Sequence, residues 1–127
     1  VLSKQLVMPS QYTGSGLKLV HGFFKTETVT AETATLDVHI EAVTPNSDTL
    51  DMETAESFST VNVVDMIPPT TVGNPTDSSK TLTNADSIAA GDSFRIGIRR
   101  DTIATSPTAD DATGDFCLYA VEIADDA

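Results

Sequence analysis

The chain has 127 residues, of which 7 are basic and 19 acidic, so its formal net charge is −12. A single domain of this length buries roughly two thirds of its unfolded surface, which is enough for a modest core. The negative charge repels phosphate backbones and anionic membranes, so it disfavours nucleic-acid binding and membrane association. We expect an acidic, hydrated surface, with a calcium-dependent or cation-bridged surface as the alternative.

The residue types favour β-structure. Threonine occurs nineteen times, and Thr, Val and Ile fit pleated sheets because their side chains are stiff at χ1. Cys117 is the only cysteine, which excludes an intramolecular disulfide and a cysteine zinc site. No apolar run reaches the ~18 residues of a membrane span, and we expect no signal peptide. The start at Val1 predicts a chain that is processed or cut from a longer product.

In the first half of the chain, apolar and polar residues alternate in several stretches. Residues 34–42 alternate most clearly, with Leu36 and Val38 on one side and Asp37, His39 and Glu41 on the other. This period of two predicts a strand with one face in the core and the other in water. We also expect strands at 1–8 (an N-terminal strand or arm), 17–24 and 58–67, and a loop rather than a short helix at 48–57.

The second half is organised around residues 91–101, where Phe94, Ile96 and Ile98 face one way and Arg95 and Arg99 the other. This stretch is typical of a half-buried strand. Its neighbours are predicted as a loop at 70–79, a short strand at 80–83, one helical turn at 84–90, a loop at 102–114, a strand at 115–123 and a frayed acidic tail at 124–127. The whole chain therefore predicts one all-β domain, 1–127, an antiparallel β-sandwich or jelly roll of about seven or eight strands.

Two groups of residues could hold a metal ion. His21 and His39 could converge from neighbouring strands, with Asp37 and Glu41 beside His39, although single surface histidines are far commoner. Asp110, Asp111 and Asp115 surround Gly114 and could supply oxygen ligands to Ca²⁺. The alternative for these aspartates is a solvated acidic turn, because their spacing matches no EF-hand. No other cofactor is expected.

The sequence offers no catalytic constellation. There is no G-x-S-x-G elbow, Cys117 lies inside a predicted strand, and residues 14–18 lack the spacing of a phosphate loop. We therefore expect that the protein is not an enzyme.

Arg95 and Arg99 have two interpretations. They could pair with nearby Asp and Glu side chains of the same chain, or they could bind carboxylates of an adjacent protomer. Apolar residues on both faces of 58–67 and of 17–24 add a second sign of an interface. The predicted assembly surface contains Phe58, Val64, Met66, Arg95 and Arg99.

Three blocks of sequence resemble a family of small virion proteins of tailed phages. They are residues 8–12 followed by a glycine turn and Leu17-Lys-Leu, residues 89–92 leading into 94–96 and 100–101, and residues 114–115 leading into 118–123. The chain differs from the family pattern at His21, in a strand where an aromatic is usual. The resemblance implies a jelly-roll-like module without catalytic residues that works by assembly as a trimer, on the capsid surface, in a tail fibre or in another tail appendage.

The alternative function is carbohydrate binding for attachment to a host surface, because jelly rolls carry many glycan sites. Its candidate contacts would be Tyr12, Tyr119, Asp110 and Asp111.

Overall fold

The computed structural model describes residues 2–8, 10, 20–25, 29–49, 58, 60–105 and 108–122. This part of the chain contains strands and turns but no helix, so the all-β prediction is confirmed. Its strands are β1 (Leu2–Val7), β2 (Val20–Phe24), β3 (Ala34–Val43), β4 (Asn62–Met66), β5 (Pro75–Ser78), β6 (Ser93–Arg100) and β7 (Phe116–Val121).

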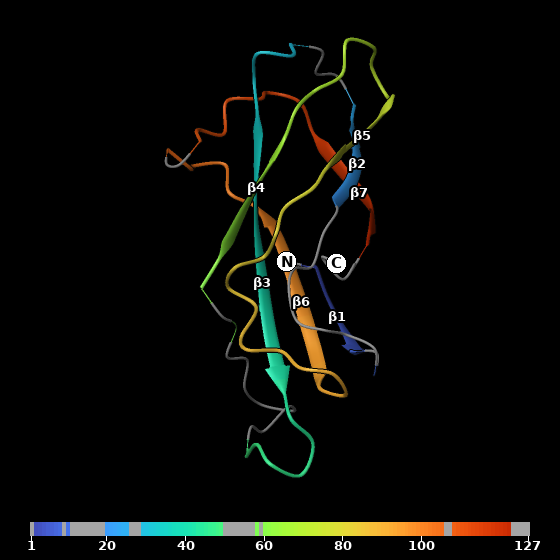
Figure 1. Ribbon diagram of the computed structural model, residues 1–127. Helices are drawn as coiled ribbons and strands as arrows, with labels where there is room; N and C mark the ends of the chain where they lie inside the picture. The colour runs from blue at the N-terminus through green and yellow to red at the C-terminus, as the bar shows by residue number, and fades with distance from the viewer. Residues whose placement is uncertain are drawn as a thin grey trace.

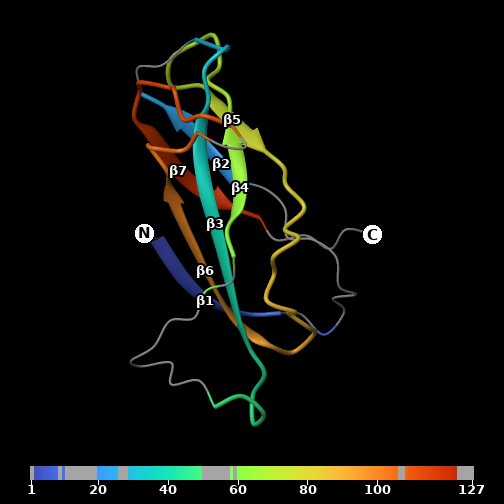
Figure 2. The same ribbon diagram turned by 90° about the vertical axis from the view of Figure 1, so that its left-hand side faces the viewer.

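The strands form two antiparallel sheets. Sheet A has the order β1-β6-β3-β4, and sheet B has the order β5-β2-β7. The long strands β3 and β6 form the centre of sheet A, and the shorter strands of sheet B lie beside its upper half (Figures 1 and 2). Two antiparallel sheets around a shared core are consistent with a β-sandwich.

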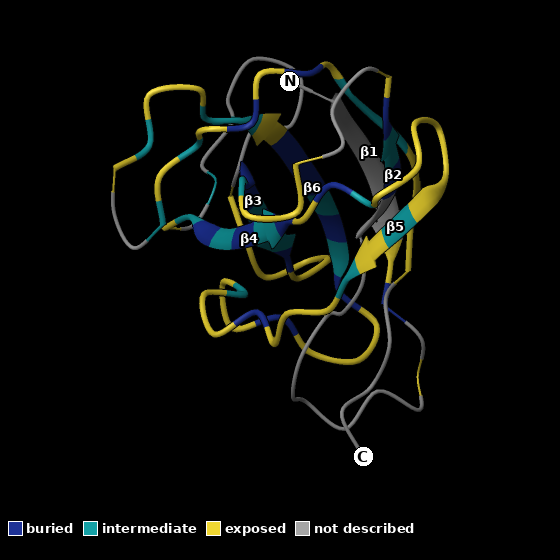
Figure 3. Cartoon of the chain, turned by 90° about the horizontal axis from the view of Figure 1, so that it is seen from above, coloured by how far each residue is buried: buried dark blue, intermediate teal, exposed yellow. Residues whose placement is uncertain are grey.

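The core lies between the sheets. Alternate residues of the central strands of sheet A are buried there: Ala34, Leu36, Val38 and Ile40 of β3, and Phe94, Ile96 and Ile98 of β6. Sheet B contributes Phe24, which is fully buried and whose ring centre lies 5.1 Å from that of Phe116. Figure 3 shows the buried residues in dark blue along β3, β4 and β6. Leu82 and Ile88, from the connection between β5 and β6, complete the core.

A buried asparagine links β4 to the chain that precedes β6. The side-chain nitrogen Nδ2 of Asn62 donates to the Val38 carbonyl at 3.2 Å and to the Asn84 carbonyl at 2.9 Å. The Asn62 side-chain oxygen accepts from the Asn84 amide at 2.9 Å. A buried amide is stable only when its donors and acceptors are used. Asn62 therefore fixes the position of residue 84 against sheet A.

Between β4 and β6 the predicted elements were wrong. β5 lies at Pro75–Ser78, within the predicted loop 70–79, and residues 80–83 form no strand. The stretch 84–90 is not helical, because Asp86 and Ser87 have φ angles of 51° and 55°, in the left-handed region. The Asp86 carboxylate accepts from the Ala42 amide at 2.9 Å, which holds this turn on the end of β3.

Gly22 marks an irregularity in the pairing of β2 with β7. The register shifts between His21 and Gly22, so that Tyr119 is an extra residue on β7, as in a β-bulge. A Cβ atom on Gly22 would lie 2.1 Å from Cζ of Phe116 and 2.8 Å from the Cys117 carbonyl oxygen. Only glycine lets the Phe116 ring pack against β2 at this point.

We predict that Gly22→Ala lowers the free energy of unfolding by about 3 kcal/mol, because the new methyl group must displace the Phe116 ring or the backbone of β7. Urea unfolding measures this change. Gly97→Ala is the matched control, because the nearest atom to its new Cβ is 3.4 Å away, and it should cost less than about 1 kcal/mol. Equal effects of the two substitutions would contradict the packing described for Gly22.

Candidate functional site

The side of sheet A that faces away from the core carries a row of polar side chains. Residues directly opposite each other in an antiparallel pair point to the same side of a sheet. The register of β3 and β6 places Glu41 opposite Arg95, His39 opposite Gly97 and Asp37 opposite Arg99. We call these six residues the outer row.

Both arginines of the outer row pair with carboxylates of β3. Arg95 Nε donates to Glu41 Oε2 at 2.5 Å, and the two side chains are 12% and 1% exposed. Arg99 Nε and Nη2 donate to Asp37 Oδ2 at 2.9 and 2.8 Å. The hydrogen bond to Asp37, with the attraction of its charge, raises the pKa of the Arg99 guanidinium. Removing either arginine would take the guanidinium away from a buried carboxylate, which is strongly unfavourable.

The alternation of β3 predicted that Asp37, His39 and Glu41 point into water, and this is wrong. Asp37 and Glu41 are 4% and 1% exposed, and His39 is half-buried. Alternation separates the two sides of a strand but does not reveal what covers each side. Here the arginines of β6 neutralise the carboxylates, so that both sides of β3 are buried.

Phe58 covers the middle of the outer row. Its ring centre lies 5.8 Å from that of His39. The ring also lies over Gly97, where an added Cβ would be 3.4 Å from Phe58 Cζ. Because Gly97 has no side chain, the aromatic ring can rest directly on the sheet between the two ion pairs.

The five residues predicted to form an assembly surface all have contacts inside the protomer. Val64 and Met66 are 2% and 0% exposed in the core, so they are not available to a second copy. Phe58 packs on the outer row, and Arg95 and Arg99 pair with carboxylates of the same chain. The structure thus shows intrachain pairs for both arginines, while the Arg99 side chain remains 52% exposed. The apolar residues of β4 reflect the core rather than an interface.

A third arginine ties the connection between β6 and β7 to the start of β3. Arg100 donates from Nε to Asp110 Oδ2 at 2.7 Å and from Nη2 to Asp110 Oδ1 at 2.6 Å, in a two-pronged contact. Its Nη1 donates to the Gly114 carbonyl at 2.6 Å, and Nη2 also donates to the Ala112 carbonyl. The hydrogen bond to Asp110 raises the pKa of the Arg100 guanidinium.

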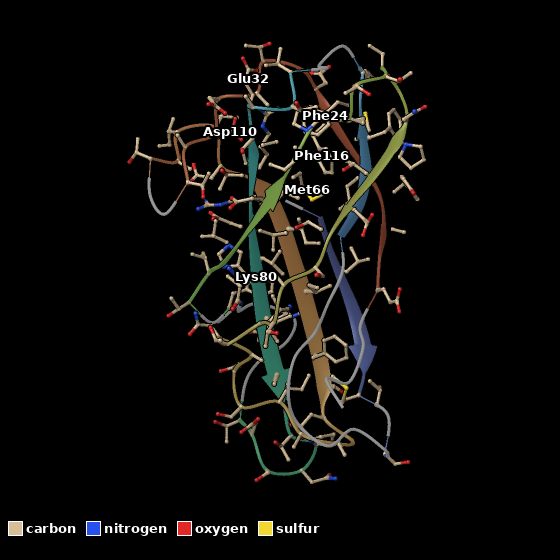
Figure 4. All side chains as sticks on the ribbon, turned by 45° about the horizontal axis from the view of Figure 1, so that its top comes forward. Phe24, Glu32, Met66, Lys80, Asp110 and Phe116 are labelled. Atoms are coloured by element: carbon tan, nitrogen blue, oxygen red, sulfur yellow. The ribbon has the colours of Figure 1, made fainter. Side chains whose placement is uncertain are left out.

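The same aspartates hold the backbone of β3. Asp110 Oδ2 accepts from the Thr35 amide at 2.8 Å, and Asp111 Oδ1 accepts from the Thr33 amide at 2.7 Å. The amides of Asp111 and Ala112 donate to the Thr33 carbonyl at 3.0 and 3.1 Å. Figure 4 shows Asp110 at the end of the sheet where β3 begins. These hydrogen bonds hold the connection between β6 and β7 against the start of β3, and we call this connection the cross-linked loop.

The three aspartates predicted for Ca²⁺ have different partners. Asp110 binds Arg100, Asp111 binds the backbone of Thr33, and the exposed Asp115 lies 3.9 Å from Lys25 Nζ. In the described part of the chain, no group of three or more His, Cys, Asp or Glu side chains could hold a metal ion. The structure therefore does not bring these carboxylates together as a ligand set.

The two histidines lie on strands of different sheets. His21 belongs to β2 of sheet B, whereas His39 is on the outer row of sheet A. The expectation that they converge from neighbouring strands is wrong, because β2 and β3 follow each other in sequence but not within a sheet.

Of the two predicted glycan contacts, Tyr119 is 57% exposed at the bulge of β7. Tyr12 lies outside the described residues. Asp110 and Asp111, the other two candidates, precede β7 and are engaged in the cross-linked loop.

The outward side of sheet B carries a row of which the sequence singled out, as a sign of an interface, only the strand that contains Phe23. Phe23 is paired with Pro75 of β5 and with Cys117 of β7, so these three side chains share the side opposite to Phe24. Pro75 is exposed, and Phe23 and Cys117 are half-buried. We call them the uncharged row. Its signal in the sequence is weak, because β5 has a loop-like composition and its pairing with β2 is not predictable.

No known protein family, curated protein sequence or solved structure matches the chain. Among the described residues, no helix is long and apolar enough to cross a membrane. The function is therefore inferred from the residues and their arrangement.

We predict that Arg100→Lys lowers the free energy of unfolding by about 2–4 kcal/mol, because lysine cannot reproduce the two-pronged contact and leaves buried acceptors without donors. Urea unfolding measures the change. Lys25→Ala is the control, since its exposed pair with Asp115 should contribute under about 0.5 kcal/mol. A loss from Lys25→Ala as large as that from Arg100→Lys would refute the assigned role of Arg100.

We predict that Ca²⁺ at about 1 mM leaves the melting temperature within about 1 °C of its value in EDTA, because a ligand that does not bind the folded state does not stabilise it. The reason is that the Asp110 and Asp111 oxygens already accept hydrogen bonds. Differential scanning calorimetry with and without Ca²⁺ checks this. A rise in the melting temperature that saturates with Ca²⁺ would restore the calcium hypothesis.

Proposed function

We propose that this chain is a structural protein of a bacteriophage virion, located on the head surface or in the tail. It acts by assembling with copies of itself and with other virion proteins, and performs no catalysis. The observation that carries the proposal is the nested pairing of its strands, taken together with the three sequence blocks that resemble such proteins.

The first six strands pair as a rolled hairpin. β1 pairs with β6 and β3 with β4 in sheet A, whereas β2 pairs with β5 in sheet B. Successive pairs of the hairpin thus alternate between the sheets, and β6 returns to pair with β3. This pattern is typical of a jelly roll, the fold of many capsid proteins. It supports the jelly-roll form of the sandwich, with β7 added beside β2.

The distribution of charged groups also favours an assembly role. The buried charges of the outer row and of the β6–β7 connection are used in ion pairs that stabilise the protomer. Apolar side chains nevertheless remain at the surface, among them Val7, Val72, Ile103 and Tyr119. Exposed apolar side chains that form a contiguous patch are typical of surfaces that contact other proteins.

The second candidate function is carbohydrate binding at a host surface, favoured by the exposure of Tyr119. An exposed aromatic ring can stack on the apolar face of a sugar. A glycan array probed in the presence of Ca²⁺ tests this function, and a set of bound glycans whose signal is lost in Tyr119→Ala would support it over assembly.

We predict a homotrimer in solution, or a copy bound to the particle. Sedimentation equilibrium of the chain measures its mass, and mass spectrometry of purified particles measures its presence in the virion. A protomer mass at every concentration, together with absence from particles, would rule out the proposed function.

A further inference from the structure

We propose, on the basis of the self-assembly suggested above, that the outward side of sheet B is the surface where copies of this chain contact one another. The occupant of this surface is a second copy, and its centre is the uncharged row of Phe23, Pro75 and Cys117.

The charge of the chain restricts where two copies can meet. Each copy carries a net charge of −12, so most pairs of surfaces repel one another. Among the residues of β2, β5 and β7, Asp77 is the only Asp, Glu, Lys or Arg. Contact between copies at sheet B therefore brings few like charges together.

The margin of this surface contains charges of both signs. Lys25 and Asp115 pair at 3.9 Å next to one end of the uncharged row. Asp77 lies two residues beyond Pro75 on β5, on the same side of the sheet but in the opposite direction along the strands. A neighbouring copy brings the same groups, so Lys25 of one copy can attract Asp77 or Asp115 of the next. The margin is thus complementary to itself, unlike the acidic loops elsewhere.

The outward side of sheet A does not offer a comparable surface. Its outer row is occupied by the intrachain ion pairs and by the Phe58 ring. On sheet B, by contrast, Pro75 and Ala120 are exposed beside the half-buried Phe23. Sheet A keeps the 65% exposed Val7 on its outward side at the end of its edge strand β1, whereas the partly uncovered apolar groups of sheet B lie together on adjacent strands.

The bulge in β7 favours contact through the face of the sheet rather than through its edge. An exposed edge strand can accept a further strand only while its backbone remains regular. The extra residue Tyr119 interrupts that regularity. Three strands of 4–6 residues also present a small area. We therefore expect weak association, with micromolar dissociation constants that copies on one particle would strengthen.

Thiol labelling locates the contact. Because Cys117 belongs to the uncharged row, sedimentation equilibrium first verifies that Cys117→Ser associates as the wild type does. In that background, Ala120→Cys places a thiol on the exposed outward side of sheet B, and Thr102→Cys places one on the exposed β6–β7 connection. Labelling with a maleimide is followed as the protein concentration rises from about 1 µM to about 500 µM. We expect the rate constant at residue 120 to fall at least about fivefold as copies associate, and that at residue 102 to stay constant.

A pair of charge variants provides the second measurement. Ala120→Glu adds a like charge to the proposed contact, whereas Thr102→Glu adds the same charge outside it. Sedimentation equilibrium should show Ala120→Glu as a protomer at concentrations where the wild type and Thr102→Glu associate. Circular dichroism verifies that both variants are folded.

The outcomes separate this surface from the proposed function. If copies associate while residue 120 labels at an unchanged rate and Ala120→Glu still associates, another surface is used and the proposal for sheet B is overturned, although self-assembly stands. If the wild type remains a protomer throughout, self-assembly and the surface on sheet B both fail.

Discussion

The structure depends on one register between β3 and β6, because this register satisfies both sides of sheet A at once. On the inner side it aligns Val38 with Ile98 and Ile40 with Ile96, and on the outer side it aligns the two carboxylates with their arginines. A shift by one residue would send Asp37 and Glu41 into the core. Hydrophobic burial alone would tolerate a shift by two, but the ion pairs would then be misaligned. The charged pairs therefore specify the register that the apolar residues stabilise.

The arginines have a consistent role in this acidic chain. Arg95, Arg99 and Arg100 are three of its seven basic residues, and each pairs with a carboxylate far from it in sequence or across a loop. Arg95 and Arg99 join neighbouring strands, whereas Arg100 joins a connection to the sheet. Excess negative charge is thus tolerated inside the fold where a guanidinium can donate several hydrogen bonds. Among the described residues, the remaining acidic groups lie mainly between the strands, and the strands of sheet B carry one acidic residue, Asp77.

Much of the fold could be predicted from the sequence, but the pairing of its strands and of its charged side chains could not. β3 and β6 show strong alternation, so their positions follow from the pattern of apolar residues. β5 was missed because Pro75-Thr-Asp-Ser78 has no strand propensity and is a strand only through its pairing with β2. The turn at 84–90 was mistaken for a helix because Asp86 adopts a left-handed backbone that local composition does not reveal. Asp110 was predicted as a Ca²⁺ ligand, but its pairing with Arg100 depends on how the connection between β6 and β7 folds back onto the sheet. The alternation of residues along one strand is a local pattern that the sequence shows directly, whereas these contacts join segments that are distant in sequence.

The nested order of strand pairs has a consequence for synthesis on the ribosome. The hairpin of β3 and β4 brings together residues close in sequence, whereas β1 pairs with β6 across most of the chain. Pairs with long sequence separation form late because closing a long loop costs entropy. Of these strands, β1 is therefore made first but acquires its neighbour β6 almost last, and the nascent chain must keep one side of sheet A open until β6 has been made.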